Sequence, residues 1–361
     1  MRIGIVLHPY GEDQPAGLAR TIFELTKGML TVDQENEYII FLKRKPRVMP
    51  ELPGKNWRVH VLGEGLLWLD HLRAAPLCDV TIFNTPVLPL FYKPKQSLAL
   101  ALDFAYYYFP PKGFKAALLN KLTFWYHKRS LKRADSIAAI SEATKDDTVK
   151  LFGIAREKIH VVLCGFKNVC AIPETPIDLP KKYFLFVGVM KQRKNVCNVV
   201  RAFRAMCEKY PDHMLVLGGR AQGEYVEEMK RYIAQEGIEK RVFFIGHLND
   251  GQLSYVYRRA SALVFASFIE GFGYPVLEAM ACGTPVITSK STSLGEICQN
   301  NSALLVDPAS VDELASAMIR IAADVSLRDE LIRNGYEQAK KFSWEKAGNE
   351  MLAVVKRALS G

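Results

Sequence analysis

Two glutamates on either side of a glycine loop are the clearest sign of chemistry in this sequence. Residues 268–279 read FIEGFGYPVLEA, with Glu270 before the glycines and Glu278 after Pro275. The preceding ALVFAS is typical of a buried strand, and proline suits the first turn of a helix, where its missing N–H costs nothing. The loop amides would then be free to bind oxygen atoms beside a helix dipole. Because carboxylates accept hydrogen bonds from hydroxyls, the pattern indicates a site for a phosphate, a ribose or a hexose.

The same residues also have a purely structural interpretation. Glu278, expected in the first helical turn, would complement the helix dipole, and Glu270 would be solvated. The spacing of the two glutamates alone leaves both interpretations open.

A basic loop follows the strand expected at residues 183–188. Residues 188–196 read GVMKQRKNV, which crowds Lys191, Arg193 and Lys194 between a strand and a helix. Ligands of open α/β sheets bind beyond the carboxyl ends of the strands, and a diphosphate there would meet these cations. Arginine adds a bidentate fork for such a group. The alternative is a solvated loop with chance basic residues.

Two further loops follow expected strands. Residues 11–20 read GEDQPAGLAR, and Gly17 would begin a helix and let the backbone approach a phosphate. The dinucleotide pattern GxGxxG is absent, which disfavours a nicotinamide-dependent oxidoreductase. His247 follows the strand expected at 242–246 and would line a cleft there, although such histidines are more often structural.

These loops need a scaffold of parallel strands. Apolar runs alternate with helical patterns in both halves, which predicts two Rossmann-like α/β domains with doubly wound parallel sheets facing a cleft. NVCAIPETPIDLPK, with three prolines, predicts a linker over 168–181 between an N-terminal domain (1–167) and a C-terminal domain (182–343). The expected strands are residues 2–7, 37–42, 57–62, 79–83, 97–102, 136–140, 159–163, 183–188, 213–219, 242–246, 262–267, 285–289 and 303–307. The expected helices lie near residues 17–30, 113–133, 142–151, 194–210, 222–235, 250–259, 275–282, 311–323, 326–340 and 344–359.

Composition and charge narrow the class of protein. The chain has 361 residues, enough for a sizeable core, and its seven cysteines form no CxxC pair or Cys/His cluster. We therefore expect reduced thiols in a reducing compartment and no structural zinc. A signal peptide and a membrane-spanning apolar run of about 18 residues are both absent, which favours the cytosol. The net charge is +10, and residues 1–167 hold +8 of it, with 24 Lys/Arg against 16 Asp/Glu, which favours an anionic partner.

Much of that charge lies in residues 112–133, KGFKAALLNKLTFWYHKRSLKR. The segment has seven Lys/Arg, no acidic residue and several interleaved aromatic and leucine side chains. Such a helix can rest on an anionic membrane surface. Alternatively it covers the sheet and presents a solvated basic face. Nucleic acid is not an expected partner, because no recognisable binding module accompanies the charge.

Taken together, the motifs resemble those of family-four retaining glycosyltransferases of the GT-B architecture, especially bacterial mannosyltransferase-like members. EGFGYPVLEAMACGTPVITS is similar to the family's EGFGLPVLEAMACGTPVI stretch, and GVMKQRKNV resembles its G-x-x-x-x-R-K-N loop. SLGEI, ALLVDP and SEATKDDTVKLFGIAREKIHVV also match, so the resemblance covers nearly the whole chain.

The resemblance implies a role for each matching residue. Glu278 would hold the ribose of a nucleotide, and Glu270 with the amides of Gly271, Phe272 and Gly273 would hold the donor sugar. Glu270 would act in catalysis together with Arg193 and Lys194, whose cations would neutralise the diphosphate leaving group. The remaining implied site residues are Gly17, His247, Leu248 and Leu277 on the donor and Asp103 on the acceptor side.

The implied reaction moves a hexose, mannose in preference, from a GDP- or UDP-linked donor to a glycan or lipid-linked acceptor of a bacterial surface polysaccharide such as lipopolysaccharide. The acceptor hydroxyl would attack from the face that the diphosphate leaves, which retains configuration. No metal or other cofactor is expected, because cationic side chains do the metal's work. The resemblance also implies a cytoplasmic protein, peripheral on the cytosolic face of the inner membrane, with a final helix (344–361) packed toward the N-terminal domain.

One position departs from the family pattern. The family usually carries a His-Asp pair after a first-domain strand, and here Leu102 stands at the histidine position while Asp103 matches. The alternative function is therefore a catalytically weakened protein that binds a sugar nucleotide or a glycan.

Overall fold

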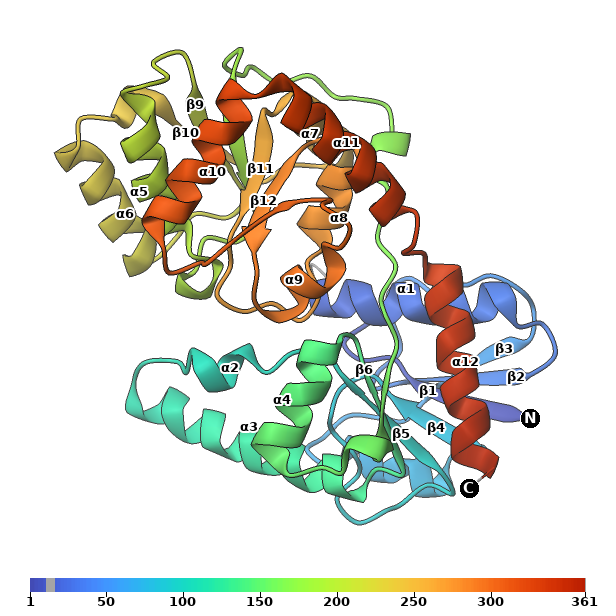
Figure 1. Ribbon diagram of the computed structural model, residues 1–361. Coiled ribbons are helices and arrows are strands. Elements are labelled where there is room, and N and C mark those ends of the chain that lie inside the picture. Colours follow the sequence, from blue (N-terminus) through green and yellow to red (C-terminus); the bar gives the residue numbers. More distant parts are fainter. Residues whose placement is uncertain (11–16, 361) are drawn as a thin grey trace. The chain divides into compact units, whose positions relative to one another are not determined.

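The chain folds into two compact units, each built on a parallel sheet with helices on both faces (Figure 1). The computed structural model describes residues 1–10 and 17–360. The first unit comprises Met1–Gly165 together with Phe342–Gly361, and the second comprises Phe166–Lys341. The sequence-based prediction of two doubly wound parallel-sheet domains is confirmed.

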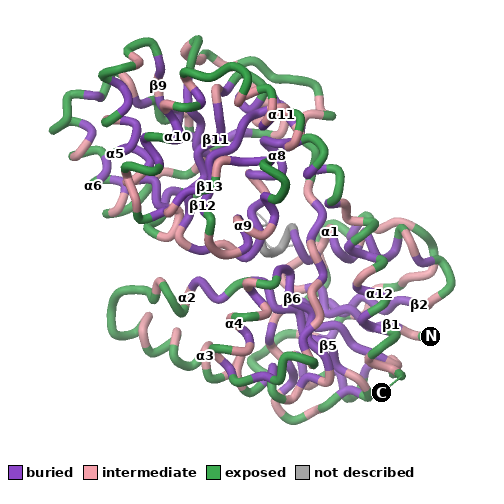
Figure 2. The backbone as a smooth tube through the Cα atoms, in the orientation of Figure 1, coloured by how far each residue is buried: buried purple, intermediate pink, exposed green. Residues whose placement is uncertain are grey.

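The first unit has a seven-stranded parallel sheet in the order β3-β2-β1-β4-β5-β6-β7. Its strands read as nearly continuous apolar runs because helices cover both faces of the sheet, and Figure 2 shows buried residues concentrated along them. The strands are β1 Arg2–Val6, β2 Glu37–Leu42, β3 Trp57–Val61, β4 Val80–Phe83, β5 Ser97–Ala101, β6 Ser136–Ala139 and β7 Ile159–Val161. The helices are α1 Gly17–Val32, α2 Ala105–Tyr108, α3 Phe114–Arg133, α4 Glu142–Phe152 and α12 Trp344–Ser360, with short 3-10 turns η1 Trp68–Ala74 and η2 Arg156–Lys158. The next 3-10 turn, η3 Val169–Ala171, belongs to the second unit.

Helix α12 belongs to the first unit although it is the last helix of the chain. It packs on α1 at a glycine pair, where a Cβ atom on Gly348 would lie 2.5 Å from the carbonyl carbon of Gly28. A Cβ on Gly28 would in turn lie 2.1 Å from the carbonyl oxygen of Trp344. Glycine at both positions is what allows the two backbones to approach so closely.

The second unit has a six-stranded parallel sheet in the order β10-β9-β8-β11-β12-β13. Its strands are β8 Tyr183–Val187, β9 Met214–Gly218, β10 Val242–Gly246, β11 Ala262–Phe265, β12 Val286–Ser289 and β13 Leu304–Val306. Its helices are α5 Val196–Cys207, α6 Glu224–Gln235, α7 Asp250–Arg259, α8 Tyr274–Ala281, α9 Thr292–Ile297, α10 Val311–Ala323 and α11 Val325–Ala339, with η4 Gln192–Lys194 and η5 Glu239–Arg241. Within the described residues, no helix of either unit combines the length and apolarity needed to cross a membrane.

The proline-containing segment 168–181 lies against the second unit at several points. The Thr175 amide donates to the Gly251 carbonyl (3.0 Å), and the Arg258 guanidinium donates to the Cys170 carbonyl (2.8 Å). Cys170 also forms a disulfide with Cys282, 112 residues further along the chain. The expectation that all seven cysteines are reduced is therefore wrong for this pair, whose members the fold brings together from distant parts of the sequence.

Candidate functional site

The candidate site lies where the winding of the second sheet reverses. The chain runs from β8 outward to β10 on one side and from β11 outward to β13 on the other, so β8 and β11 are the neighbours at the switch point. Ligands of open α/β sheets bind beyond the carboxyl ends of the strands at such a point. The basic loop follows β8 and the glycine loop follows β11, which places both predicted motifs at this edge.

Glu270 is the centre of a nearly buried ion cluster. Its Oε2 accepts a hydrogen bond from Nη1 of Arg193 at 3.2 Å, and its Oε1 accepts from Nζ of Lys194. The three side chains are only 9%, 26% and 13% exposed for Glu270, Arg193 and Lys194, respectively. The structure thus brings the three predicted catalytic residues together and excludes the interpretation that Glu270 is solvated.

The cations keep Glu270 ionised. Burial alone would raise the pKa of this carboxyl, but the charges of Lys194 and Arg193 and the hydrogen bond from Lys194 outweigh it, so the pKa lies below its ordinary range. Lys194 is held further by the ring of Phe265, whose centroid lies 4.8 Å from Nζ. Arg193 Nη1 also donates to the Ile269 carbonyl at 3.2 Å. Lysine and arginine are the side chains that bind phosphate oxygens in proteins, so the cluster has the chemistry of an anion site.

Asn195, next to these cations, fixes the loop and was not predicted as a site residue. Its backbone is left-handed (φ 59°), and its Nδ2 donates to the carbonyl oxygens of Ala266 (2.9 Å) and Pro308 (2.6 Å). One buried amide therefore ties together the loops that follow β8, β11 and β13. The signal in the sequence was the asparagine of the RKN motif, because asparagine tolerates the left-handed region better than most residues.

The glycine loop leads from Glu270 into α8. Ser293 Oγ donates to the Glu270 carbonyl at 2.9 Å, which braces the loop entry. Gly273 precedes the helix with φ 121°, and a Cβ there would lie 2.6 Å from Leu294 Cδ2. Only glycine suits that position, and the loop passes through Gly271 and Phe272 into the helix start that the sequence predicted.

Glu278 lies in the second turn of α8, not in the first. It is the fifth residue of the helix, its side chain is buried, and its Oε2 accepts from the Tyr257 hydroxyl at 3.2 Å. The expectation of a first-turn position is wrong because the helix begins at Tyr274, one residue before the proline. The interpretation that Glu278 complements the helix dipole loses its basis, because the residue lies outside the first turn and its carboxylate is bonded to a tyrosine hydroxyl.

Other predicted donor residues occupy the same sheet edge or the core beside it. His247 is exposed and Leu248 is buried, both just after β10. Gly219 follows β9, and a Cβ there would lie 2.1 Å from the Gly188 carbonyl oxygen, so the loops after β8 and β9 touch through backbone alone. Leu277 is fully buried in α8, which leaves its side chain no exposed surface.

The predicted site residues of the first unit lie at the carboxyl edge of its own sheet. Asp103 is exposed after β5 and accepts a hydrogen bond from the Ala105 amide at 3.1 Å. Leu102, at the position where the resemblance expects histidine, is buried. Gly17 is the first residue of α1, and residues 11–16 of the preceding loop lie outside the described part of the chain.

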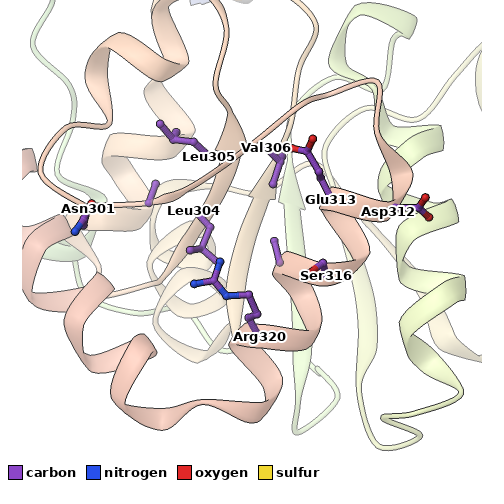
Figure 3. Close-up of a pocket in the computed structure, with 10 residues that line it drawn as sticks. Asn301, Leu304, Leu305, Val306, Asp312, Glu313, Ser316 and Arg320 are labelled. Atoms are coloured by element: carbon purple, nitrogen blue, oxygen red, sulfur yellow. The ribbon is translucent and has the colours of Figure 1, made fainter.

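A pocket elsewhere in the second unit does not include these residues. Figure 3 shows this pocket of about 590 Å³ beside β13 and α10, with Asn301, Leu304, Glu313 and Arg320 in its lining. Glu313 is paired there with Lys290 at 3.7 Å and accepts from the Asp307 amide. The pocket therefore shares no residue with the ion cluster, and its Glu313 is engaged in local contacts.

The whole-chain architecture matches that of GT-B glycosyltransferases. HepE of Anabaena, solved in complex with UDP and glucose, aligns with a TM-score of 0.75 at 17% identity, over 98% of this chain and 99% of that one. WaaG, described as a glycosyltransferase involved in lipopolysaccharide biosynthesis, aligns with a TM-score of 0.71 at 15% identity, over 98% and 99%. At such identities the likeness concerns the fold.

Sequence comparison finds two glycosyltransferase domains. The model for glycosyl transferases group 1 matches residues 171–338, and the model for glycosyltransferase family 4 matches residues 59–167. The chain therefore carries both of these glycosyltransferase domains, one after the other. The O-antigen chain mannosyltransferase B of Escherichia coli is 31% identical over 242 residues, which are 63% of this chain and 62% of that protein. The chain therefore spans less than two thirds of the length of this curated relative.

Proposed function

We propose that this chain transfers a hexose from a nucleotide-diphosphate sugar to a glycan or lipid-linked acceptor with retention of configuration. The observation that carries the proposal is the ion cluster of Glu270, Lys194 and Arg193 at the switch point of the second unit. When the sugar is transferred, the nucleoside diphosphate leaves from its anomeric carbon, and pre-positioned cations stabilise the charge that builds on this leaving group in the transition state.

The roles follow from the charge and chemistry of each group. Lys194 and Arg193 supply the positive charge that binds the diphosphate oxygens. Glu270 fixes both cations and retains lone pairs that accept from hydroxyls of the donor sugar, with the amides of Gly271 and Gly273 beside it. Glu278 accepts from the ribose hydroxyls, and the bond from Tyr257 holds its carboxylate in place.

The reaction needs no nucleophile from the protein. The bond between the anomeric carbon and the diphosphate oxygen breaks, and the acceptor hydroxyl forms the new bond on the same face. Its proton passes to an oxygen of the departing diphosphate. Cationic side chains do the charge-neutralising work, so transfer in the presence of a chelator is part of the proposal.

Mannose from GDP-mannose is the donor that we propose. The support is that the curated relatives include the O-antigen chain mannosyltransferases B of Escherichia coli and RfbU of Salmonella typhimurium. A UDP-linked sugar is the runner-up, because HepE was solved with UDP-glucose. The names of these relatives, which refer to the O-antigen chain, support a surface-polysaccharide acceptor. A peripheral position on the cytosolic face of the inner membrane is part of the same proposal.

Calorimetric titration of the purified chain with GDP-mannose, GDP, UDP-glucose and UDP tests the donor. We expect GDP-mannose to bind and to be transferred or slowly hydrolysed, and we expect UDP-glucose to bind less tightly. Binding without transfer or hydrolysis would favour the alternative, a weakened sugar-nucleotide-binding protein suggested by Leu102. Failure of every nucleotide to bind would refute the site itself.

A further inference from the structure

Helix α3 presents an apolar stripe to solvent. Phe114 is 86% exposed, Leu118 49%, Leu122 55% and Trp125 58%. The steps between them are four, four and three residues, which places all four on one face of the helix. Leu119, 65% exposed, lies beside them. We call Phe114, Leu118, Leu122 and Trp125 the α3 stripe.

The sides of α3 that turn toward the rest of the first unit already have their partners. Phe124 stacks on Phe152, with ring centroids 5.0 Å apart, and on Tyr107 at 5.4 Å. Tyr126 donates to the Leu88 carbonyl at 2.7 Å, and Leu131 is fully buried. A helix that only covers a sheet turns its apolar face inward and a polar face outward. Here both faces carry large apolar side chains, so the simpler interpretation of residues 112–133 does not account for the outer one.

Basic side chains border the stripe. Lys115 and Lys121 lie in the same turns of α3 as the stripe, and both are exposed. Lys128, Arg129 and Lys132 continue the outer side toward the end of the helix, and the sequence has no acidic residue between Asp103 and Asp135. The outer face is therefore apolar at its first three turns and cationic around and beyond them.

We propose that this face docks on a bilayer surface rich in anionic lipid, with the α3 stripe inserted among the headgroups and the lysines against the phosphates. The proposal rests on the peripheral membrane position given in the proposed function, and it names the protein surface that makes the contact. It does not depend on the transfer chemistry. Burial of leucine and phenylalanine side chains away from water is favourable, and each basic residue near an anionic surface adds electrostatic attraction. Together these suffice for reversible binding of a helix lying in the interface.

Charge decides against a second copy of the chain as the occupant. A two-fold contact through the α3 stripe would place Lys115 and Lys121 opposite their own copies, and like charges face to face are unfavourable. An anionic lipid surface satisfies the apolar and the cationic groups together.

Vesicle co-sedimentation of the full chain tests the proposal. We expect binding to phosphatidylglycerol/phosphatidylcholine vesicles at low salt and little binding to phosphatidylcholine alone. Leu118→Ser/Leu122→Ser should abolish pelleting, while the control Leu66→Ser/Leu77→Ser removes two leucines that are 98% and 75% exposed elsewhere in the first unit and should bind normally. Lys115→Glu/Lys121→Glu should weaken binding and reduce its salt dependence.

Trp125 reports insertion directly. Its emission should shift to the blue with vesicles and be quenched by brominated lipid, and Trp125→Phe should remove the signal. Equal pelleting of the stripe variant and the control, or self-association without lipid binding, would overturn the proposal. Nucleotide binding by the Leu118→Ser/Leu122→Ser variant separates the two hypotheses, because it should stay intact even where vesicle binding is lost.

Discussion

The carboxyl edges of the two sheets are built very differently. In the second unit, the loops at the switch point are fixed by the ion cluster around Glu270 and by the Asn195 amide. In the first unit, the loops after the corresponding neighbours β1 and β4 are joined by an uncharged hydrogen bond, from Asn84 Nδ2 to the His8 carbonyl at 2.8 Å. Asp103 is exposed there.

The difference teaches where rigidity is needed. Stabilising a leaving group requires charges that are already in position, because reorganising them during the reaction would cost what they gain. Under the proposed function, a surface that only receives the acceptor has no such requirement. The excess positive charge of the first unit lies instead on α3, away from any buried cluster.

Removing one cation of the cluster should have the largest effect. Lys194→Ala should reduce transfer by about 10²–10³-fold, the usual loss when one pre-positioned donor to a developing charge is removed. Arg193 still pairs with Glu270, so the fold should persist, as checked by circular dichroism melting. Lys191→Ala, in the same loop but exposed, is the control. Near-normal transfer by Lys194→Ala would mean that the cluster is structural.

Opening the disulfide should destabilise the second unit and leave the first unchanged. Cys282→Ser releases a loop of 112 residues, for which a loss of about 2–4 kcal/mol in the free energy of unfolding is typical. Denaturant titration with and without reductant measures it, and Cys78→Ser in the first unit is the control. Labelling under denaturing conditions should find five free thiols; seven would contradict the pairing.

Loss of the buried carboxylate on α8 should act on nucleotide binding. Glu278→Ala should weaken GDP binding by about 1.5–3 kcal/mol, the range for hydrogen bonds to a charged group. Tyr257→Phe should cost less, because the carboxylate remains and loses only one bond. Calorimetry with the free nucleotide measures both affinities. An unchanged affinity in Glu278→Ala would mean that the ribose does not bind to Glu278.

Mild acid should weaken the first unit slightly. Burial lowers the pKa of His127 to about 4, and its Nδ1 lies 2.8 Å from the Tyr106 hydroxyl. The unfolded chain takes up this proton near pH 6.5, so folded stability is complete above that value and falls as the pH drops from 6.5 toward 4. The melting temperature of His127→Phe should depend less on pH in this window. The control is His247→Gln, which alters an exposed side chain of the second unit and should leave the dependence unchanged.

Sequence reasoning located every strand because each is an apolar run between turn residues, and it placed Arg193, Lys194 and Glu270 in one site. It missed α2, whose four residues are too few for a periodic pattern, and α9, which begins at Thr292 with φ 58°. The partners of Asn195 lie 71 and 113 residues away, and those of Cys170 lie 112 away. Such pairings form only when the chain folds, so the spacing of residues along the sequence does not predict them.

The position of α12 has a consequence for synthesis on the ribosome. α1 emerges early, but the helix that packs on its glycine face is translated after the whole second unit. During synthesis, the α1 face of the first unit therefore stays without α12 until residues 166–341 have been translated. A fragment ending at Gly165 would lack α12 altogether. Expression of the first unit by itself would call for a spliced gene that joins codon 165 to codon 342.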